Sequence, residues 1–90
     1  MTPDEAIGLA IKRTRVAQGL SQESIGASQS FVSDVERGKK SVTMHRLDEF
    51  AKALGISPAT LMVKAELIAT PEITLDELIE KIRSQANGNS

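Results

Sequence analysis

The stretch that decides the fold is residues 20–38, which read LSQESIGASQSFVSDVERG. Ser21 and Ser28 each open a short segment, and serine is a preferred residue at the position directly before a helix. Gly26 lies between the two segments and Gly38 follows the second, where glycine suits a turn or a helix end. The stretch therefore predicts two short helices joined by a tight turn.

The second of these helices, residues 28–37, has an apolar face and a polar face when successive residues are placed about 100° apart. The apolar face carries Phe31, Val32 and Val35, and the polar face carries Gln29, Ser30, Ser33, Asp34 and Arg37. Short amide, hydroxyl and carboxylate groups can bind base edges in the DNA major groove. Glutamine pairs with adenine, serine with either kind of base, and aspartate with the cytosine amino group. We therefore expect the apolar face to pack and the polar face to contact DNA bases.

Motifs spaced along the chain resemble the Cro/C1-type (XRE) helix-turn-helix family. They are LSQE at 20–23, SQSFVSDVERG at 28–38 and ALGI at 53–56, and the resemblance covers roughly residues 5 to 66. This family contains phage repressors, restriction-modification controller proteins and antitoxin-type autoregulators. The resemblance implies an all-α fold, a five-helix lambda-repressor-like DNA-binding domain in which the 28–37 helix is the recognition helix.

The chain departs from the family in one place. Members usually carry about one more helical turn, roughly four residues, between the Ser-Gln-Glu segment and the serine that opens the recognition helix. Only residues 24–27 fill that gap here. We therefore expect a short first helix in the motif, with the recognition helix nearly in phase. The shortening affects how this first helix, and Gln22 within it, meets the DNA backbone.

Cap residues and apolar periodicity predict the other helices. They are expected from about Pro3 or Asp4 to Gln18, after Thr43 as far as Gly55, after Ser57 towards residue 69, and after Thr74. We expect residues 1–69 to form the DNA-binding domain and residues 70–84 to add a C-terminal helix, a candidate dimerisation element. Residues 85–90 are expected to form a flexible tail.

The C-terminal helix carries an apolar stripe at helical spacing. Its members are Leu75, Leu78, Ile79 and Ile82. A lone helix of this length is marginal in water, so the stripe must be buried against something. Two alternatives are open. The stripe forms the interface of a homodimer, or it packs within the chain over Leu9 and Val16, which lie together on one side of the first helix.

The resemblance also implies roles for individual side chains. Gln29, Ser30 and Asp34 occupy the positions that most often reach bases, and Ser33 lies nearer the edge of that face. The candidates for phosphate contact are Gln22, Arg13, Lys39, Lys40 and Thr43. Arg15 and Glu36 resemble an ion pair that joins the first helix to the recognition helix. A structural role suits them, because an unpaired charge at the edge of a packed face is costly.

The composition excludes several classes of protein. The 90 residues include no cysteine and one histidine, so neither disulfides nor a Cys/His metal site is expected. No stretch approaches the roughly 20 apolar residues of a membrane span. The sequence contains no recognisable catalytic set and no phosphate-binding glycine loop. We therefore expect a cytoplasmic protein that is not an enzyme, takes no cofactor or metal and does not bind a membrane.

The expected function is sequence-specific binding of double-stranded DNA by a homodimeric transcriptional regulator, a repressor or autoregulator on a two-fold operator. Two half-sites about one helical turn apart roughly double the base contacts of a single short helix. The alternative is a protein-interaction module, an antitoxin or adaptor that binds a protein partner on the same helical scaffold. The net charge of −1 keeps this alternative open, because DNA-binding proteins often carry strongly basic surfaces.

Overall fold

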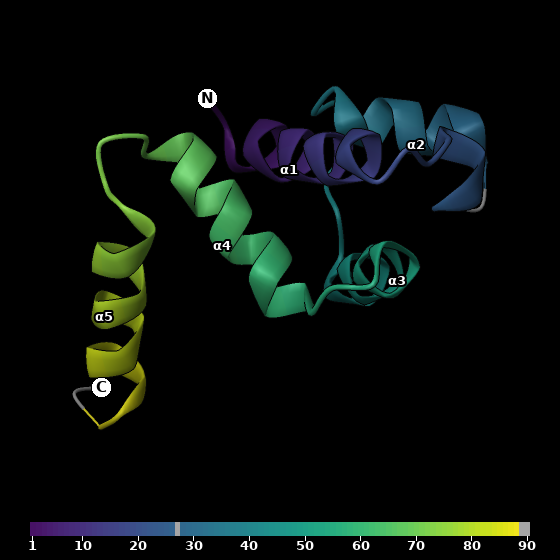
Figure 1. The fold of residues 1–90 in the computed structure, drawn as a ribbon. Helices are drawn as coiled ribbons and strands as arrows, with labels where there is room; N and C mark the ends of the chain where they lie inside the picture. Colours follow the sequence, from purple (N-terminus) through teal and green to yellow (C-terminus); the bar gives the residue numbers. More distant parts are fainter. Residues whose placement is uncertain (27, 89–90) are drawn as a thin grey trace.

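The computed structural model describes residues 1–26 and 28–88 of the chain, and within them the fold is all helical (Figure 1). The elements are α1 (Pro3–Ala17), the short 3-10 helix η1 (Gln22–Ser24), α2 (Gln29–Glu36), α3 (Met44–Leu54), α4 (Pro58–Ala69) and α5 (Leu75–Ala86). The helix-turn-helix motif consists of η1 and α2. The predicted all-α fold class is confirmed.

Four of the helices begin at the cap residues predicted from the sequence, which are Ser28, Thr43, Ser57 and Thr74. Each side-chain oxygen accepts a hydrogen bond of 3.0–3.2 Å from the backbone N–H three residues later. A cap of this kind contributes about 1 kcal/mol. Helix α1 begins in the same way at Thr2, which forms a reciprocal capping box with Glu5. The start of the recognition helix is therefore set by local sequence.

The first helix of the motif is reduced to a single turn of 3-10 helix. Ile25 directly follows η1 and is buried, so the chain turns inward at once. A Cβ atom on Gly26 would lie only 2.3 Å from Cγ2 of Val32 in α2. Glycine is therefore the residue that lets the shortened turn pass this close to the recognition helix.

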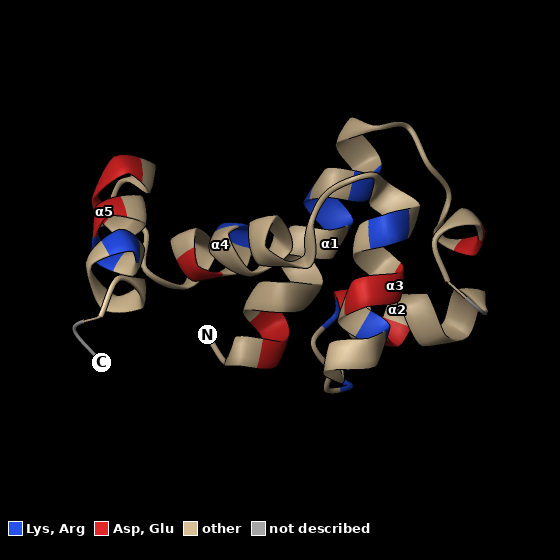
Figure 2. Cartoon of the chain, turned by 90° about the horizontal axis from the view of Figure 1, so that it is seen from below, with Lys and Arg blue, Asp and Glu red and all other residues tan. Residues whose placement is uncertain are grey.

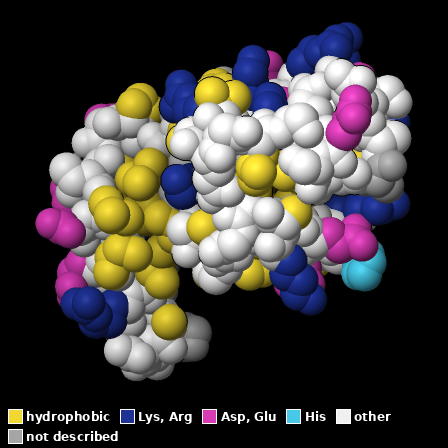
Figure 3. Space-filling model, turned by 45° about the vertical axis from the view of Figure 1, so that its right-hand side comes forward, with side chains coloured by type: hydrophobic (Ala, Val, Ile, Leu, Met, Phe, Trp, Pro, Cys, Tyr) yellow, Lys and Arg dark blue, Asp and Glu magenta, His cyan; other side chains and the backbone are white. Residues whose placement is uncertain are grey.

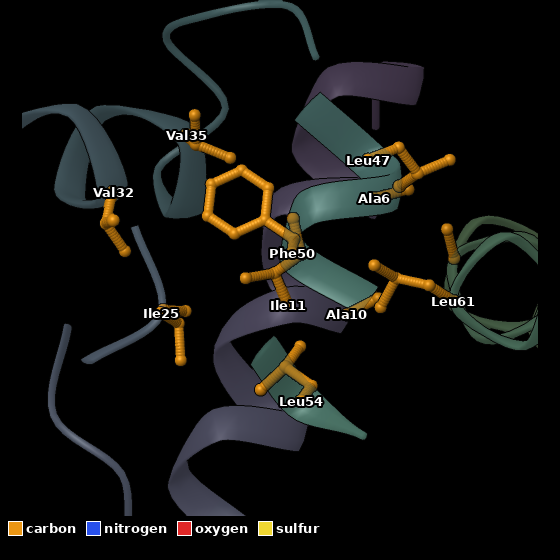
Figure 4. Packing of buried hydrophobic residues seen from close by; sticks show 11 residues of the cluster. Ala6, Ala10, Ile11, Ile25, Val32, Val35, Leu47, Phe50, Leu54 and Leu61 are labelled. Carbon is orange, nitrogen blue, oxygen red and sulfur yellow. The ribbon is translucent and has the colours of Figure 1, made fainter. Parts of the chain in front are cut away.

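The core lies where α1, α2, α3 and α4 meet, and α1 packs most extensively on α4. Figure 4 shows side chains from these four helices turned toward one another around Phe50. The largest fully buried side chains are Ile11, Leu61, Val32 and Val35. Since Val32 and Val35 belong to α2, the predicted apolar face of that helix packs on the body, and its polar face is turned outward.

Helices α1 and α2 come unusually close to each other at Gly8. A Cβ atom at this position would lie 2.1 Å from the carbonyl oxygen of Val35 and 3.1 Å from that of Glu36. Both are backbone atoms, so any side chain here would displace α2 itself. The bare backbone of α1 therefore sets the position of the C-terminal end of the recognition helix.

Helix α5 stands apart from α1, α2 and α3 (Figure 1). Leu78 is only 2% exposed within the single chain, whereas three other members of the apolar stripe remain open. They are Leu75, Ile79 and Ile82, at 50%, 38% and 39% exposed. Val16 is 58% exposed, so the structure does not place α5 over the outer side of α1. The helix lies beside α4 instead, where Ile82 lines a hollow with α4 residues.

The C-terminal helix is longer than predicted. It continues to Ala86, so the first two residues of the expected flexible tail are helical. The first residue described beyond Asn87 is Gly88, whose φ of 101° is unsuited to an α-helix. Residues 89–90 lie outside the described residues. The division into a 1–69 domain and a 70–84 element stays a prediction.

Candidate nucleic-acid interface

The polar face of α2 lies on the surface of the molecule. Gln29 and Ser30, in the first turn, are exposed, while Ser33 and Asp34 are half-buried. The opposite side of the helix is closed, because Val32 and Val35 have no exposed surface. The structure therefore brings the four predicted base-contact residues together on one accessible side of one helix.

Two of these four side chains already have partners within the chain. Arg37 donates a hydrogen bond from Nη2 to Oγ of Ser33. Nζ of Lys40 lies 3.8 Å from Oδ2 of Asp34. Exposed contacts of this kind contribute about 0 to 1 kcal/mol. They orient Ser33 and Asp34, but they are weak enough for a nucleic acid to replace them.

A buried ion pair joins the C-terminal end of α2 to α1. Arg15 donates from Nε to Oε2 of Glu36 at 2.7 Å and from Nη2 to Oε1 at 3.0 Å. Its Nη1 also donates to the carbonyl oxygen of Leu20 at 2.8 Å. Only 13% of the Arg15 side chain and 2% of the Glu36 side chain are exposed. The hydrogen bonds to Glu36 raise the pKa of Arg15, so the guanidinium stays charged.

Gln22 belongs to the same network. Its Nε2 donates to Oε1 of Glu36 at 3.0 Å. The structure therefore places this amide on the buried ion pair, where it links η1 to α2. The amide keeps one further hydrogen, and a phosphate contact through that hydrogen stays a prediction.

Three predicted phosphate contacts lie between α2 and α3. Lys39, Lys40 and Thr43 are all exposed. Oγ1 of Thr43 accepts the backbone N–H of Arg46 as the cap of α3, and a hydroxyl that accepts one hydrogen bond can still donate another. All three lie between the end of α2 and the start of α3, and their contact with phosphates stays a prediction.

Arg13 lies elsewhere. It lines a hollow between α1 and α4 together with Lys64, Leu67 and Ile68. Arg13 and Arg15 are about 200° apart around α1, and it is Arg15 that reaches α2. The structure therefore does not bring Arg13 to the recognition helix.

Helical periodicity predicts only a packing role for Phe31, but the structure places two cations around its ring. The Phe31 ring is stacked on that of Phe50, with centroids 6.1 Å apart and an angle of 7° between the ring planes. Nζ of Lys40 and Cζ of Arg46 lie 5.5 and 5.1 Å from the centroid of the Phe31 ring. The available signal was Arg46 itself, a basic residue in the first turn of a helix, where acidic residues are favoured.

Basic residues are spread over the helices that surround α2. Figure 2 shows Lys and Arg on α1 and α3, and both signs of charge on α5.

In the described part of the chain, no three His, Cys, Asp or Glu residues are placed to hold a metal ion. Among residues 1–26 and 28–88 no helix has the length and apolar character needed to cross a membrane.

A helix-turn-helix family model matches residues 11–61, which contain η1, α2 and α3. The chain belongs to the XRE-type helix-turn-helix family. It is therefore a DNA-binding transcriptional regulator of that type.

Individual relatives agree with this assignment. The chain is similar to y4dJ, an uncharacterized HTH-type transcriptional regulator of Sinorhizobium fredii, with 36% identity over 67% of this chain and 83% of that protein. The solved structure of the clp gene regulator ClgR from Corynebacterium glutamicum matches with a TM-score of 0.73 and 25% identity, over 94% of this chain and 95% of that chain. The restriction-modification controller protein C.AhdI from Aeromonas hydrophila matches with a TM-score of 0.60 and 36% identity, over 63% and 92%.

Proposed function

We propose that this regulator acts as a homodimer that binds a two-fold operator and represses transcription by occupying promoter DNA. Each copy inserts the polar face of α2 into the major groove of one half-site, where Gln29, Ser30, Ser33 and Asp34 meet base edges. The observation that carries this proposal is the asymmetry of α2, in which Val32 and Val35 are fully buried while Gln29 and Ser30 are exposed. A helix held in this way presents its polar face without rearrangement.

Backbone contacts by Lys39, Lys40 and Thr43 position the protein on the duplex. Such contacts supply affinity and carry little sequence information. Gln22 is a further candidate through its remaining amide hydrogen. Specificity then comes from the polar face of α2, and affinity comes in large part from the loop that follows it.

Homodimerisation is supported by apolar surface on α4 and α5. The exposed members of the α5 stripe, Leu75, Ile79 and Ile82, are accompanied by Met62 of α4, which is 49% exposed. Met62 and Ile82 also line a hollow of about 250 Å³ between the two helices. Figure 3 shows hydrophobic side chains gathered in one region of the surface. Contiguous apolar patches of this kind commonly mark protein interfaces, and a second copy of the chain would cover this one.

Ile79→Asp tests the dimer. Light scattering after size-exclusion chromatography is expected to give a folded monomer near the chain mass of 9.7 kDa, against twice that mass for the wild type. Val16→Asp, at an exposed apolar residue of α1, is the matched control and is expected to stay dimeric. A wild type that is monomeric at micromolar concentration, or an Ile79→Asp variant that stays dimeric, contradicts the proposed interface.

Selection of bound sequences from random duplex DNA tests the function. The wild type is expected to enrich a palindromic consensus, and a Gln29→Ala/Ser30→Ala variant is expected to lose that enrichment while remaining folded. Absence of enrichment at low salt would overturn the proposal and favour the protein-interaction module instead.

A further inference from the structure

The region around Phe31 brings together cations from two segments that follow the recognition helix. Lys40 belongs to the loop after α2 and Arg46 to the first turn of α3, and both charged groups lie within 5.5 Å of the centroid of one ring. The ring is itself fixed, since it stacks on Phe50, which is 2% exposed. Phe31, Lys40 and Arg46 together form a cation cluster.

Two cations over one ring are each attracted to the ring but repel each other. A cation–π contact contributes about 0.5 to 1 kcal/mol at an exposed site. Each cation also has a carboxylate neighbour, Asp34 at 3.8 Å from Lys40 and Glu49 at 3.1 Å from Arg46. These four side chains are at least 36% exposed, so the ion pairs are weak. A polyanion, which places several negative charges near both cations at once, can therefore displace both carboxylates.

The cation cluster is continuous with the polar face of α2. Lys40 contacts Asp34 on that face as well as the ring of Phe31. Phe31 directly follows Ser30 in the first turn of the helix. When the polar face lies in the major groove, the cluster therefore lies at the edge of the groove. The anion at that edge is the phosphate backbone, which protein cations contact in most DNA complexes.

We infer that Arg46 and Lys40 bind backbone phosphates of duplex DNA beside the half-site, and that Phe31 is the positioning residue that holds both cations. The inference rests on the proposed function and adds to it a phosphate contact, Arg46, and a role for an aromatic side chain. Arginine can donate paired hydrogen bonds to phosphate oxygens, and displacement of Glu49 frees those donors. Arg46 then contributes to affinity for any DNA sequence.

Arg46→Gln tests the phosphate contact through the salt dependence of binding. Each phosphate contact adds about −0.9 to the slope of log affinity against log salt. The slope of the variant is therefore expected to be shallower by about 0.9, with an affinity about eightfold lower at roughly 0.1 M salt. The loss should be the same for the selected operator and for unrelated duplex DNA.

Arg83→Gln is the matched control for this experiment. Arg83 pairs with Glu80 three residues before it on α5, much as Arg46 pairs with Glu49 on α3, but it lies on a different helix from the cation cluster. This variant is expected to keep the wild-type slope. Equal slopes for Arg46→Gln and the wild type would overturn the assignment of Arg46.

Phe31→Leu and Phe31→Tyr test the positioning role. Leucine keeps an apolar group beside Phe50 but removes the ring, so the salt dependence is expected to become shallower, whereas tyrosine restores the ring and the wild-type slope. Binding is measured at a temperature where melting curves show each free variant to be folded. A folded Phe31→Leu variant with the wild-type slope would overturn the role of Phe31.

Failure of this inference is distinguishable from failure of the proposed function. If the wild type binds no duplex DNA at low salt, the proposed function fails and the inference fails with it. If the wild type binds its selected operator and Arg46→Gln binds with the same slope, the inference alone fails.

Discussion

Glu36 and Asp34 are two residues apart on the same helix, yet their surroundings are opposite. Glu36 is 2% exposed at its side chain and accepts three hydrogen bonds, two from Arg15 and one from Gln22. Asp34 is 36% exposed at its side chain and has Lys40 at 3.8 Å. Two residues turn a helix by about 200°, so Glu36 faces α1 while Asp34 lies on the surface. The buried carboxylate of α2 thus fixes this helix on α1, whereas its exposed carboxylate stays accessible to a ligand.

Displacing the buried side of α2 is expected to lower the stability of the protein most. Gly8→Ala places a Cβ atom 2.1 Å from the carbonyl oxygen of Val35, and only movement of α2 relieves that contact. We expect the free energy of unfolding to fall by roughly 3 kcal/mol or more, measured by urea unfolding. Gly55→Ala is the control, since its φ is +71° but no atom lies within 4 Å, and its cost is expected to be about 1 kcal/mol. Equal costs would show that the close approach is not what holds α2.

Removing each carboxylate in turn is expected to affect stability very differently. Glu36→Ala leaves the guanidinium of Arg15 largely buried and without its carboxylate, so we expect a loss of about 3 kcal/mol. Asp34→Ala removes an exposed charge and is expected to change stability by less than about 0.5 kcal/mol. Thermal unfolding at neutral pH measures both. Equal shifts in melting temperature would contradict the division between the two residues.

The exposed face is tested by its effect on DNA binding instead. The wild type is expected to bind the selected operator more tightly than an operator changed at one base pair. Gln29→Ala is expected to reduce this difference in binding free energy by about 1 to 3 kcal/mol, because a paired amide contact to a base is lost. The melting temperature should not change. A uniform loss of affinity for every sequence would instead assign Gln29 to the phosphate backbone.

The smallest effect concerns an exposed carboxylate that has a backbone partner. Glu77 accepts the backbone N–H of Thr74 at 3.0 Å, and this hydrogen bond lowers the pKa of Glu77 below 4.5. Because the folded pKa lies below the unfolded one, the stability that Glu77 adds is present above about pH 4.5 and is lost as the pH falls through the lowered pKa. Glu77→Gln is therefore expected to lose slightly less stability than the wild type between about pH 5 and pH 3 in thermal melts. Identical pH profiles would count against the capping role.

The local parts of this architecture could be predicted from the sequence. Ser28 and Thr43 were predicted as caps because a cap depends only on a side chain and a backbone N–H three residues away. The two faces of α2 followed from helical periodicity alone. The family motif indicated a helix-turn-helix at residues 20–38, and the family model matches residues 11–61, which include that stretch.

The remaining features depend on contacts between elements that are distant in the sequence. Nothing in the pattern around Gly8 indicates that a carbonyl oxygen of α2 lies against it. Arg13 and Lys40 were equal candidates by charge, but Arg13 lies about 200° around α1 from Arg15, the residue that reaches α2, and it lines a hollow with α4. Leu78 differs from its neighbours in the stripe only because the monomer itself covers it. Periodicity predicts which residues share a face and does not predict what that face meets.

NMR titration of the isotope-labelled protein with its selected duplex tests whether the exposed face of α2 contacts DNA bases. We expect the largest chemical-shift changes in residues 28–46, including the side-chain amide of Gln29, with small changes in α4. Changes confined to α4 and α5, with the signals of α2 unmoved at saturation, would contradict this expectation.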